Sequence, residues 1–343
     1  MKKNYTELGI VNLMKIRTFR PFIGQHCETT VTGSLLNQLN IKLSEPMMFG
    51  LGEGLGYIFW NMKSMDFPFI GGRVKPMSLT KSLARNLNLK LDMKETTSLK
   101  KAWINAKELL DEDIAIGLQL DCYHLEYFTK QIHFAGHFVA MYGYDDYYAY
   151  LVDTKQQGGL VKNSLKKLEL ARSEKGPMSS KNLVYSLRKV EKEYNLLEAI
   201  VTAISNNAAE YINPPIKNIG YKGILKTSTE LKKWFKRSRD IKYEFCTTAM
   251  IMEKAGTGGA LFRNFYRDFL KEAYDITKLE YIGEAYCMFI EIASLWTETS
   301  QLIDGAGKKN SESLIDKACD VLIELSEKEF SAMTILQKSP VSR

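Results

Sequence analysis

The feature that most constrains this fold is a change in hydrophobic period near residue 195. From there onward, apolar residues recur three and four positions apart, as they do along one face of an amphipathic helix. The clearest segments are NLLEAIVTAISNNAAEYI, ALFRNFYRDFLKEAYDI and IGEAYCMFIEIASLWTETSQLI. Asn213-Pro214-Pro215 ends the first of them, because proline cannot continue a helix. The chain after residue 195 is therefore predicted to be almost entirely helical.

The first half of the chain has a different pattern. Residues 22–155 mix helical and strand periods, and all four histidines lie there: His26, His124, His133 and His137. Residues 155–190, which contain KQQGG and ARSEKGPMSS, are typical of a connection that runs over the surface. We therefore predict an α+β domain over residues 1–190 and a mostly α-helical domain over residues 191–343.

Charge and hydropathy exclude several classes of partner. The net charge of +7 is modest for 343 residues, the basic residues form no long block, and no nucleic-acid motif accompanies them. No apolar stretch approaches the ~18 residues of a membrane span, and no signal-peptide run follows the initial Met-Lys-Lys. We therefore expect neither a nucleic-acid nor a membrane partner, whereas a homo-oligomer is compatible with the sequence.

The cysteines are few and widely spaced, at positions 27, 122, 246, 287 and 319. They form no CxxC pair and no zinc-type spacing, which argues against a disulfide framework and against a metal site. The reducing cytoplasm is therefore the expected compartment.

One of these cysteines, Cys27, lies in the segment FIGQHCETTVTGSLLNQL. Residues 28–39 fit a helix, and Glu28 in its first turn complements the helix dipole. Cys27 would then lie at the helix N-terminus, where unpaired N–H groups and the dipole favour the thiolate. The alternative is an inert thiol that fills a tight spot in the core.

Residues 136–154, GHFVAMYGYDDYYAYLVDT, have the pattern of a β-hairpin around Asp145-Asp146. With a three-residue loop over 144–146, position 137 pairs with position 153. His137 and Asp153 would then be direct cross-strand neighbours, with Cβ atoms about 5 Å apart. A two-residue loop would instead place them on opposite faces of the sheet.

A histidine beside a carboxylate is oriented by it and made more basic, and it can then activate a thiol. Cys27, His137 and Asp153 would supply the nucleophile, the base and the orienting acid of a cysteine enzyme. The order Cys, His, acid along the chain suits a papain-like arrangement. We therefore predict these three as catalytic residues.

The chain also resembles the butirosin biosynthesis protein H family, a branch of the papain-like cysteine enzymes. The similar pieces are GQHCETTVTGSLL, SEPMMFGLGEGLGYIF, GGR at 71–73, DCYHLEYFTKQIHFAGHFVAMYGYD, ARSEKGP and, in the helical half, EKAGTGGALFRNFYRDFL. Together they extend over most of residues 20–300. The resemblance implies a papain-like cysteine-enzyme domain followed by a mostly α-helical domain, with Cys27, His137 and Asp153 aligned with the family's nucleophile, histidine and acid.

The same resemblance implies an activity. The family's named member moves an acyl group from an acyl-carrier-protein thioester onto an amine of an aminoglycoside. By analogy, this chain is expected to be an amide-forming acyltransferase with an acyl carrier protein and a small-molecule amine as partners. It would hold no bound cofactor, since phosphopantetheine arrives on the carrier protein. The alternatives are a cysteine peptidase or amidase on the same triad, and a non-catalytic protein that binds a carrier protein or a metabolite.

One position departs from the wider papain pattern. Papain-like enzymes carry an oxyanion-hole glutamine about six residues before the cysteine, where this chain has Pro21. The remaining candidates for the oxyanion donor are Gln25 and backbone N–H groups near Cys27.

Three further motifs are candidates for substrate binding, each with a structural alternative. FGLGEGLGY lacks the dinucleotide spacing GxGxxG, so Gly52, Glu53 and Gly54 either form a wall for an acyl chain or pantetheine arm or make a tight packing turn. DCYHLEYF, after the apolar run IAIGLQL, has the pattern of a strand end that feeds a loop near the active site. In it, Tyr123 and His124 either contact the acceptor or are hydrogen-bonded structural residues.

The third motif is GTGGALFRNFYRDFL at residues 256–270, a glycine turn that enters a helix. Arg263 and Arg267 lie four residues apart, on one helix face. They either help to hold the phosphate of a phosphopantetheine arm or belong to a closely packed helix with solvated arginines.

Overall fold

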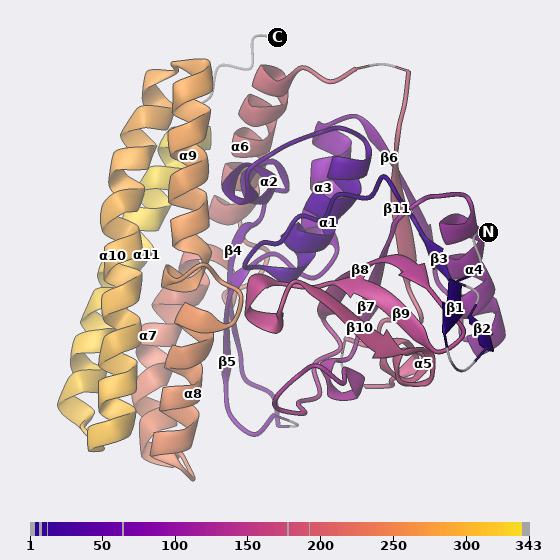
Figure 1. The fold of residues 1–343 in the computed structure, drawn as a ribbon. Coiled ribbons are helices and arrows are strands. Elements are labelled where there is room, and N and C mark those ends of the chain that lie inside the picture. The colour runs from indigo at the N-terminus through magenta and orange to yellow at the C-terminus, as the bar shows by residue number, and fades with distance from the viewer. Residues whose placement is uncertain are drawn as a thin grey trace. The chain divides into compact units, whose positions relative to one another are not determined.

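The computed structural model describes residues 4–6, 9–11, 13–63, 65–176, 178–191 and 193–337. The sequence-based expectation about a signal peptide at the start of the chain falls partly outside these residues. The chain forms two compact units, Met1–Met48 with Asn88–Glu193, and Phe49–Leu87 with Tyr194–Arg343 (Figure 1). The segment 49–87, which the sequence analysis assigned to the first domain, therefore belongs to the second unit.

The first unit is built on an antiparallel sheet with the strand order β10-β9-β8-β7-β11-β6, and β3 pairs with β8. The strands are β3 (Met14–Lys15), β6 (Leu89–Lys94), β7 (Ile116–Leu120), β8 (His137–Tyr144), β9 (Tyr148–Val152), β10 (Leu160–Ser164) and β11 (Val184–Lys189). A separate pair is formed by β1 (Asn4–Thr6) and β2 (Gly9–Val11). The central strands β7 and β8 carry nearly continuous buried residues, as expected for strands covered on both faces.

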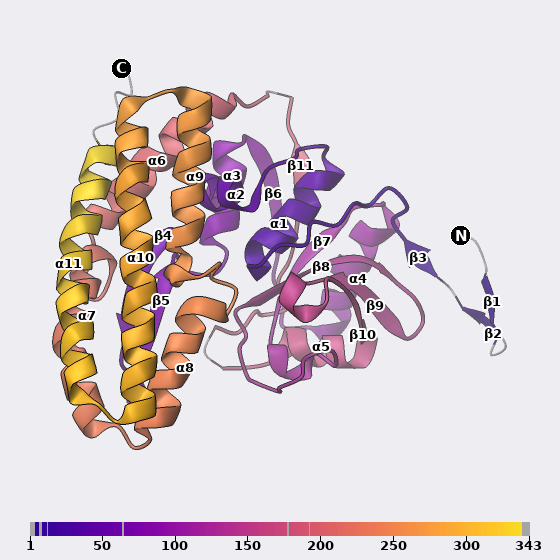
Figure 2. The ribbon, with the colours of Figure 1, turned by 60° about the vertical axis from the view of Figure 1, so that its left-hand side comes forward.

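Helix α1 (Cys27–Gln38) packs against β8 and β7, as Figure 2 shows. It is buried over most of its length, so its polar residues need internal partners. Thr32 and Ser34 meet this need by bonding back to the carbonyls of Glu28 and Thr30, at 2.7 and 2.9 Å. Gly33 is required by packing, because a Cβ there would lie 2.6 Å from the Phe22 ring.

The other helical elements of the first unit include two helices that pack on strands of the sheet, among them the central strand β7. These elements are α4 (Leu99–Asp111), η1 (Cys122–His124), η2 (Lys155–Gln157) and α5 (Leu165–Ser173). Helix α5 packs against η1 and β7, so it supports the end of β7 where the functional residues gather. Helix α2 (Glu45–Leu51) begins in the first unit and ends in the second.

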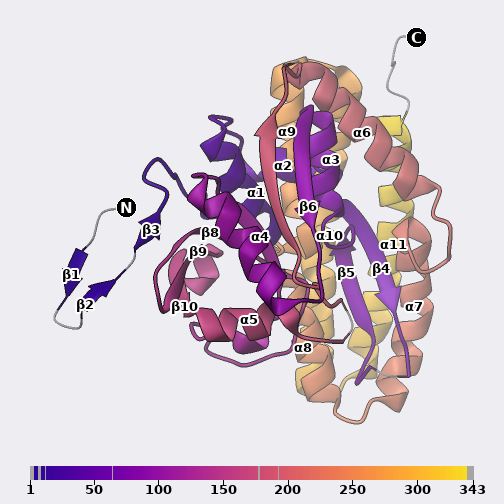
Figure 3. The ribbon, with the colours of Figure 1, turned by 90° about the vertical axis from the view of Figure 1, so that its right-hand side faces the viewer.

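The second unit is a helical bundle with one β-hairpin. Its helices are α3 (Ser78–Asn86), α6 (Leu196–Ile212), α7 (Gly220–Arg237), α8 (Ile241–Lys254), η3 (Ala260–Phe262), α9 (Arg263–Thr277), α10 (Glu280–Lys309) and α11 (Glu312–Gln337). The hairpin of β4 (Leu55–Trp60) and β5 (Phe69–Arg73) runs beside α7 (Figure 3). The prediction of a helical second half is confirmed, and the hairpin that joins it comes from the first half of the chain.

Within the residues that the structure describes, no helix combines the length and the apolar character needed to cross a membrane. The same residues contain no cluster of three or more His, Cys, Asp or Glu side chains that could hold a metal ion.

Candidate active site

The hairpin that carries His137 and Asp153 is tighter than the sequence predicted. The backbone N–H of Asp145 donates to the Tyr148 carbonyl at 2.9 Å, which leaves Asp146 and Tyr147 as a two-residue loop. The predicted three-residue loop is therefore wrong. By itself, the shorter loop would turn His137 and Asp153 to opposite faces of the sheet.

A β-bulge in β8 reverses this effect. Gly143 is paired with Tyr150, but Met141 is paired with Leu151, so Tyr142 is an extra residue in β8. Beyond the bulge the register has shifted by one position, and Ala140 faces Val152. Continuing this register, Asp153 lies opposite position 139, two residues from His137 and on the same face. The two side chains are diagonal neighbours rather than the direct partners that we predicted.

His137 and Asp153 form a buried, hydrogen-bonded pair. His137 Nε2 lies 2.8 Å from Asp153 Oδ2, and the two residues are 7% and 0% exposed. Burial by itself would lower the pKa of His137, but the carboxylate of Asp153 outweighs it and raises that pKa well above its ordinary value. The predicted acid therefore orients the predicted base.

A second thiol, that of Cys122, lies near this imidazole. The Cys122 side chain is close enough to His137 to raise the pKa of its imidazole further. Sheet pairing explains the position, because Leu120 faces His137 across β7 and β8 and Cys122 follows two residues later. The sequence analysis did not single out Cys122, since its closeness to His137 depends on a pairing between strands that are far apart in the sequence.

The loop after η1 adds two more residues that the sequence analysis did not single out. The Tyr127 hydroxyl donates to Asp153 Oδ2 at 2.8 Å. The Phe128 ring meets the His137 ring edge to face, with centroids 5.4 Å apart. Cys122, Tyr127 and Phe128 all come from DCYHLEYF, the motif predicted to feed a loop near the active site.

Cys27 is the first residue of α1, as predicted, and its side chain is half-buried. The buried carboxylate of Glu45 holds the turn before it, accepting the backbone N–H of Gln25 at 2.9 Å and that of His26 at 2.9 Å. The Gly24 carbonyl accepts the Lys155 N–H at 2.8 Å, so this turn is bonded to the segment that follows Asp153. The packing of α1 on β8 and this bond bring the elements of the predicted triad together, and direct contact between Cys27 and His137 stays a prediction.

The same hydrogen bonds narrow the choice of oxyanion donors. The backbone N–H groups of Gln25 and His26 both donate to Glu45, so neither is available to a substrate oxygen. The side chain of Gln25 is exposed, and its role as a donor stays a prediction.

Tyr123 and His124 lie in η1, just before this loop. His124 Nε2 is 2.6 Å from Glu174 Oε2, which lowers the pKa of Glu174. The Tyr123 ring stacks on His133, with centroids 4.1 Å apart, and His133 approaches the Asp121 carboxylate. These contacts favour the structural alternative for His124, whereas Tyr123 is partly exposed and its contact with an acceptor stays a prediction.

The glycine-rich turn belongs to the second unit and has a packing role. A Cβ at Gly52 would lie 2.5 Å from the Leu79 side chain, and one at Gly54 would lie 2.8 Å from the Phe49 ring. The Glu53 carboxylate accepts hydrogen bonds from Arg85 at 2.6 Å and Asn206 at 3.0 Å. These three residues therefore make the tight packing turn, and the alternative of a wall for an acyl chain is not supported, because protein atoms fill the space beside both glycines.

The structure also corrects the prediction for Arg263. Its side chain is fully buried, and all five N–H groups are bonded within the protein. Nε and Nη2 donate to Glu329 at 2.7 and 2.9 Å, and the other donors bond the carbonyls of Gly72 and Leu261 and the hydroxyl of Tyr211. Arg263 therefore has no donor left for a phosphate.

Arg267 lies one turn further along α9 and is bonded to its own helix. It donates to Asp268 at 2.8 Å and to Asn264 at 2.9 Å. Because its side chain is partly exposed, its phosphate-binding role stays a prediction, now without help from Arg263.

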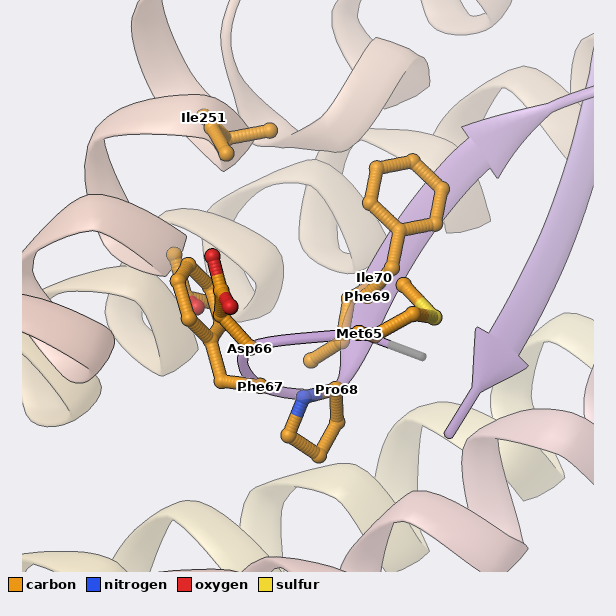
Figure 4. Close-up of a pocket in the computed structure, with 8 residues that line it drawn as sticks. Met65, Asp66, Phe67, Pro68, Phe69, Ile70 and Ile251 are labelled. Atoms are coloured by element: carbon orange, nitrogen blue, oxygen red, sulfur yellow. The ribbon is translucent and has the colours of Figure 1, made fainter. Parts of the chain in front are cut away.

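The second unit contains a pocket of about 310 Å³ next to the hairpin loop. Figure 4 shows its lining, which is formed by residues 65–70 together with Thr248 and Ile251 of α8. Asp66 is the one ionisable residue of this lining, so the pocket offers no pair of groups for acid–base or nucleophilic chemistry. The His137–Asp153 pair is therefore the better candidate for a catalytic centre.

Comparison with known proteins gives two family matches, one in each half of the chain. Residues 26–154 match the family model described as Butirosin biosynthesis protein H, N-terminal, and residues 166–336 match the one described as Domain of unknown function (DUF4872). No curated protein matches the chain. A solved structure from Bacillus anthracis described as a C39-like peptidase is similar at 16% identity and a TM-score of 0.37, covering 53% of this chain and 100% of that one. A likeness this weak carries no argument about the chain.

The two family matches follow each other in the order that the resemblance predicted, the sheet-containing region first and the helical region second. The chain therefore carries a butirosin biosynthesis protein H N-terminal domain followed by a DUF4872 domain.

Proposed function

We propose that this protein is a cysteine acyltransferase that moves an acyl group from an acyl-carrier-protein thioester, through Cys27, to an amine of a small molecule. The observation that carries the proposal is the buried His137–Asp153 pair on the strands against which the Cys27 helix packs. A base oriented by a carboxylate, next to a cysteine at a helix N-terminus, is the arrangement that nucleophilic acyl transfer needs. The match to the butirosin biosynthesis family supports an acyl donor on a carrier protein.

Two steps would complete the transfer. Cys27 Sγ attacks the thioester carbonyl, its proton passes to His137, and the carrier-protein thiol leaves with that proton. The amine then attacks the acyl-enzyme, loses a proton to His137, and Cys27 leaves as the thiol while the amide forms. Since Asp153 holds Nε2 of His137, Nδ1 is the nitrogen left to exchange these protons.

Incubation of the protein with acyl-carrier-protein thioesters, followed by intact-mass measurement, tests the covalent step. The expected result is an acyl adduct that forms on the wild type, is absent from Cys27→Ser, and disappears with amide formation when an amine is added. Release of the acid at the same rate without amine would assign a peptidase or amidase instead. No adduct and no turnover with any thioester, together with binding of the carrier protein, would assign a binding protein.

Cys122 needs its own variant in this experiment, because its thiol also lies near His137. Cys122→Ser is expected to keep the acyl adduct, since Cys122 is buried and Cys27 is half-buried. An adduct that survives in Cys27→Ser and is lost in Cys122→Ser would overturn the assignment of Cys27 and make Cys122 the nucleophile.

A further inference from the structure

We propose that Tyr127 is a positioning residue that acts on His137 through the carboxylate of Asp153; this inference rests on the proposed function. The Tyr127 hydroxyl donates to Asp153 Oδ2 at 2.8 Å. The same oxygen accepts His137 Nε2, also at 2.8 Å. One carboxylate oxygen is therefore shared between the imidazole and the tyrosine.

These contacts fix the plane of the carboxylate. Asp153 Oδ1 accepts the backbone N–H of Thr154 at 2.6 Å, so the carboxylate has three donors in all. Thr154 holds one oxygen, whereas Tyr127 and His137 approach the other. Without the hydroxyl, Oδ2 would depend on the imidazole alone for its hydrogen bond, and a fully buried carboxylate has no water to replace the lost donor.

Tyr127 is itself held by the sheet. Its neighbour Glu126 donates its backbone N–H to Asn163 on β10 at 2.7 Å and accepts the Ser164 N–H with its carboxylate at 2.7 Å. Phe128 N–H donates to the Leu125 carbonyl, which closes the turn around Tyr127. The loop is thus bonded to one edge of the sheet while its tyrosine reaches the acid of the predicted triad.

The hydroxyl is a permanent donor in this position. Burial and the nearby Asp153 carboxylate raise the pKa of Tyr127 well above its ordinary value, so the phenol keeps its proton. Its hydrogen bond disperses part of the Asp153 charge, which limits how strongly the carboxylate holds the proton of the imidazolium. Removing the hydroxyl should therefore make His137 a weaker acid and slow the step in which it protonates the leaving thiol.

Tyr127→Phe tests this inference, with Tyr150→Phe as the matched control. Tyr150 makes a comparable bond to Asp145 at 2.6 Å in the same sheet, away from His137. We expect Tyr127→Phe to lower kcat about tenfold with KM within about twofold, and Tyr150→Phe to leave both unchanged. The NMR titration of His137 should move to higher pH in Tyr127→Phe alone.

A double-mutant cycle separates positioning from a merely structural role. If Tyr127 acts through Asp153, then Tyr127→Phe should cost nothing further in an Asp153→Asn background. Additive losses, or an unchanged kcat and His137 titration in Tyr127→Phe, would overturn the inference. The NMR titration of His137 needs no substrate, so it tests the inference even if the wild type transfers no acyl group. Absence of acyl transfer would contradict the proposed function and not the role of Tyr127.

Discussion

Among the residues that the structure describes, each unit contains a buried ion pair, and the two pairs are built alike. In the first unit, Asp153 accepts His137 Nε2 and the Tyr127 hydroxyl. In the second, Glu329 accepts Arg263 and the Tyr211 hydroxyl, and also the Trp296 indole N–H at 2.6 Å. The pairs differ in what remains unsatisfied. Every Arg263 donor is bonded inside the protein, whereas Asp153 holds only one of the two imidazole nitrogens of His137.

This difference separates a structural pair from a catalytic one. Arginine does not lose its proton in proteins, and burial, which by itself lowers the pKa of Arg263, is outweighed by Glu329, so that the pKa lies above its ordinary value. Histidine, unlike arginine, can both gain and lose a proton, and each of its two ring nitrogens can carry that proton. The Arg263–Glu329 pair can only hold the bundle together, while a pair that contains a titratable ring can also move protons.

The largest expected effect is a loss of turnover when the charge of Asp153 is removed by a substitution that keeps the size and shape of its side chain. Asp153→Asn should lower acyl transfer by about 10⁴-fold, because the imidazole loses the partner that orients it and stabilises its charge. Steady-state kinetics with an acyl-carrier-protein thioester and an amine measure this loss. The fold should persist, which circular dichroism and thermal unfolding check; a variant that is inactive because it has unfolded would break the comparison.

Breaking the Arg263–Glu329 pair should lower the stability of the fold and leave the catalytic rate of the folded protein unchanged. Arg263→Met leaves the Glu329 carboxylate buried without its counter-ion, so we expect the free energy of unfolding to fall by about 3–5 kcal/mol. Urea unfolding measures it, and Arg263→Met combined with Glu329→Leu should lose less than Arg263→Met alone. Normal stability of Arg263→Met, or loss of turnover per folded molecule, would contradict the structural role of this pair.

The rate at which each cysteine is alkylated tests whether the His137–Asp153 pair activates Cys27. If His137 supports a thiolate at Cys27, then Cys27 should react with iodoacetamide faster than Cys246 or Cys319, and His137→Ala should slow it about tenfold. Burial raises the pKa of both of these other thiols, that of Cys319 to about 11. Peptide mass mapping after brief labelling gives the rates, and exposed Cys287 is the internal control, since His137→Ala should not change it. Equal rates at all sites would remove Cys27 from the mechanism.

The smallest expected effect is a difference in how the stability contributed by each pair depends on pH. The pKa of His137 is raised in the folded state, above an unfolded value of about 6.5. Its pair therefore contributes fully to stability below about pH 6.5, and the contribution is lost as pH rises through the folded pKa. The destabilisation caused by His137→Ala, from urea unfolding between pH 6 and 9, should decline as pH rises. The destabilisation caused by Arg263→Met should not change with pH. If the destabilisation by both substitutions declined in parallel, the two pairs would not differ in pH dependence.

Local pattern alone predicted much of this protein. The helical period after residue 195 matches α6 to α11, because the spacing that buries one helix face is written within each segment. Cys27 was expected at the start of a helix, and His137 and Asp153 on one face of a hairpin, both from nearby residues. The two residues do share that face. The loop is one residue shorter than predicted, and the bulge at Tyr142 adds one residue to β8, so the two differences cancel.

Tertiary structure decided the rest, because it depends on which distant segments pair. One extra residue in a strand changes the register of a hairpin. Tyr142 is that extra residue in β8, and the local sequence pattern does not predict the bulge there. Cys122 and Tyr127 reach the His–Asp pair only because β7 lies beside β8 and the loop after it returns to the sheet. Arg263 had the sequence context of a solvated arginine at a helix start, yet Glu329, 66 residues later, makes it a buried ion pair. The sequence determined the helical and strand segments through periods of a few residues, whereas the neighbours of each charged side chain were decided by the packing of the whole unit.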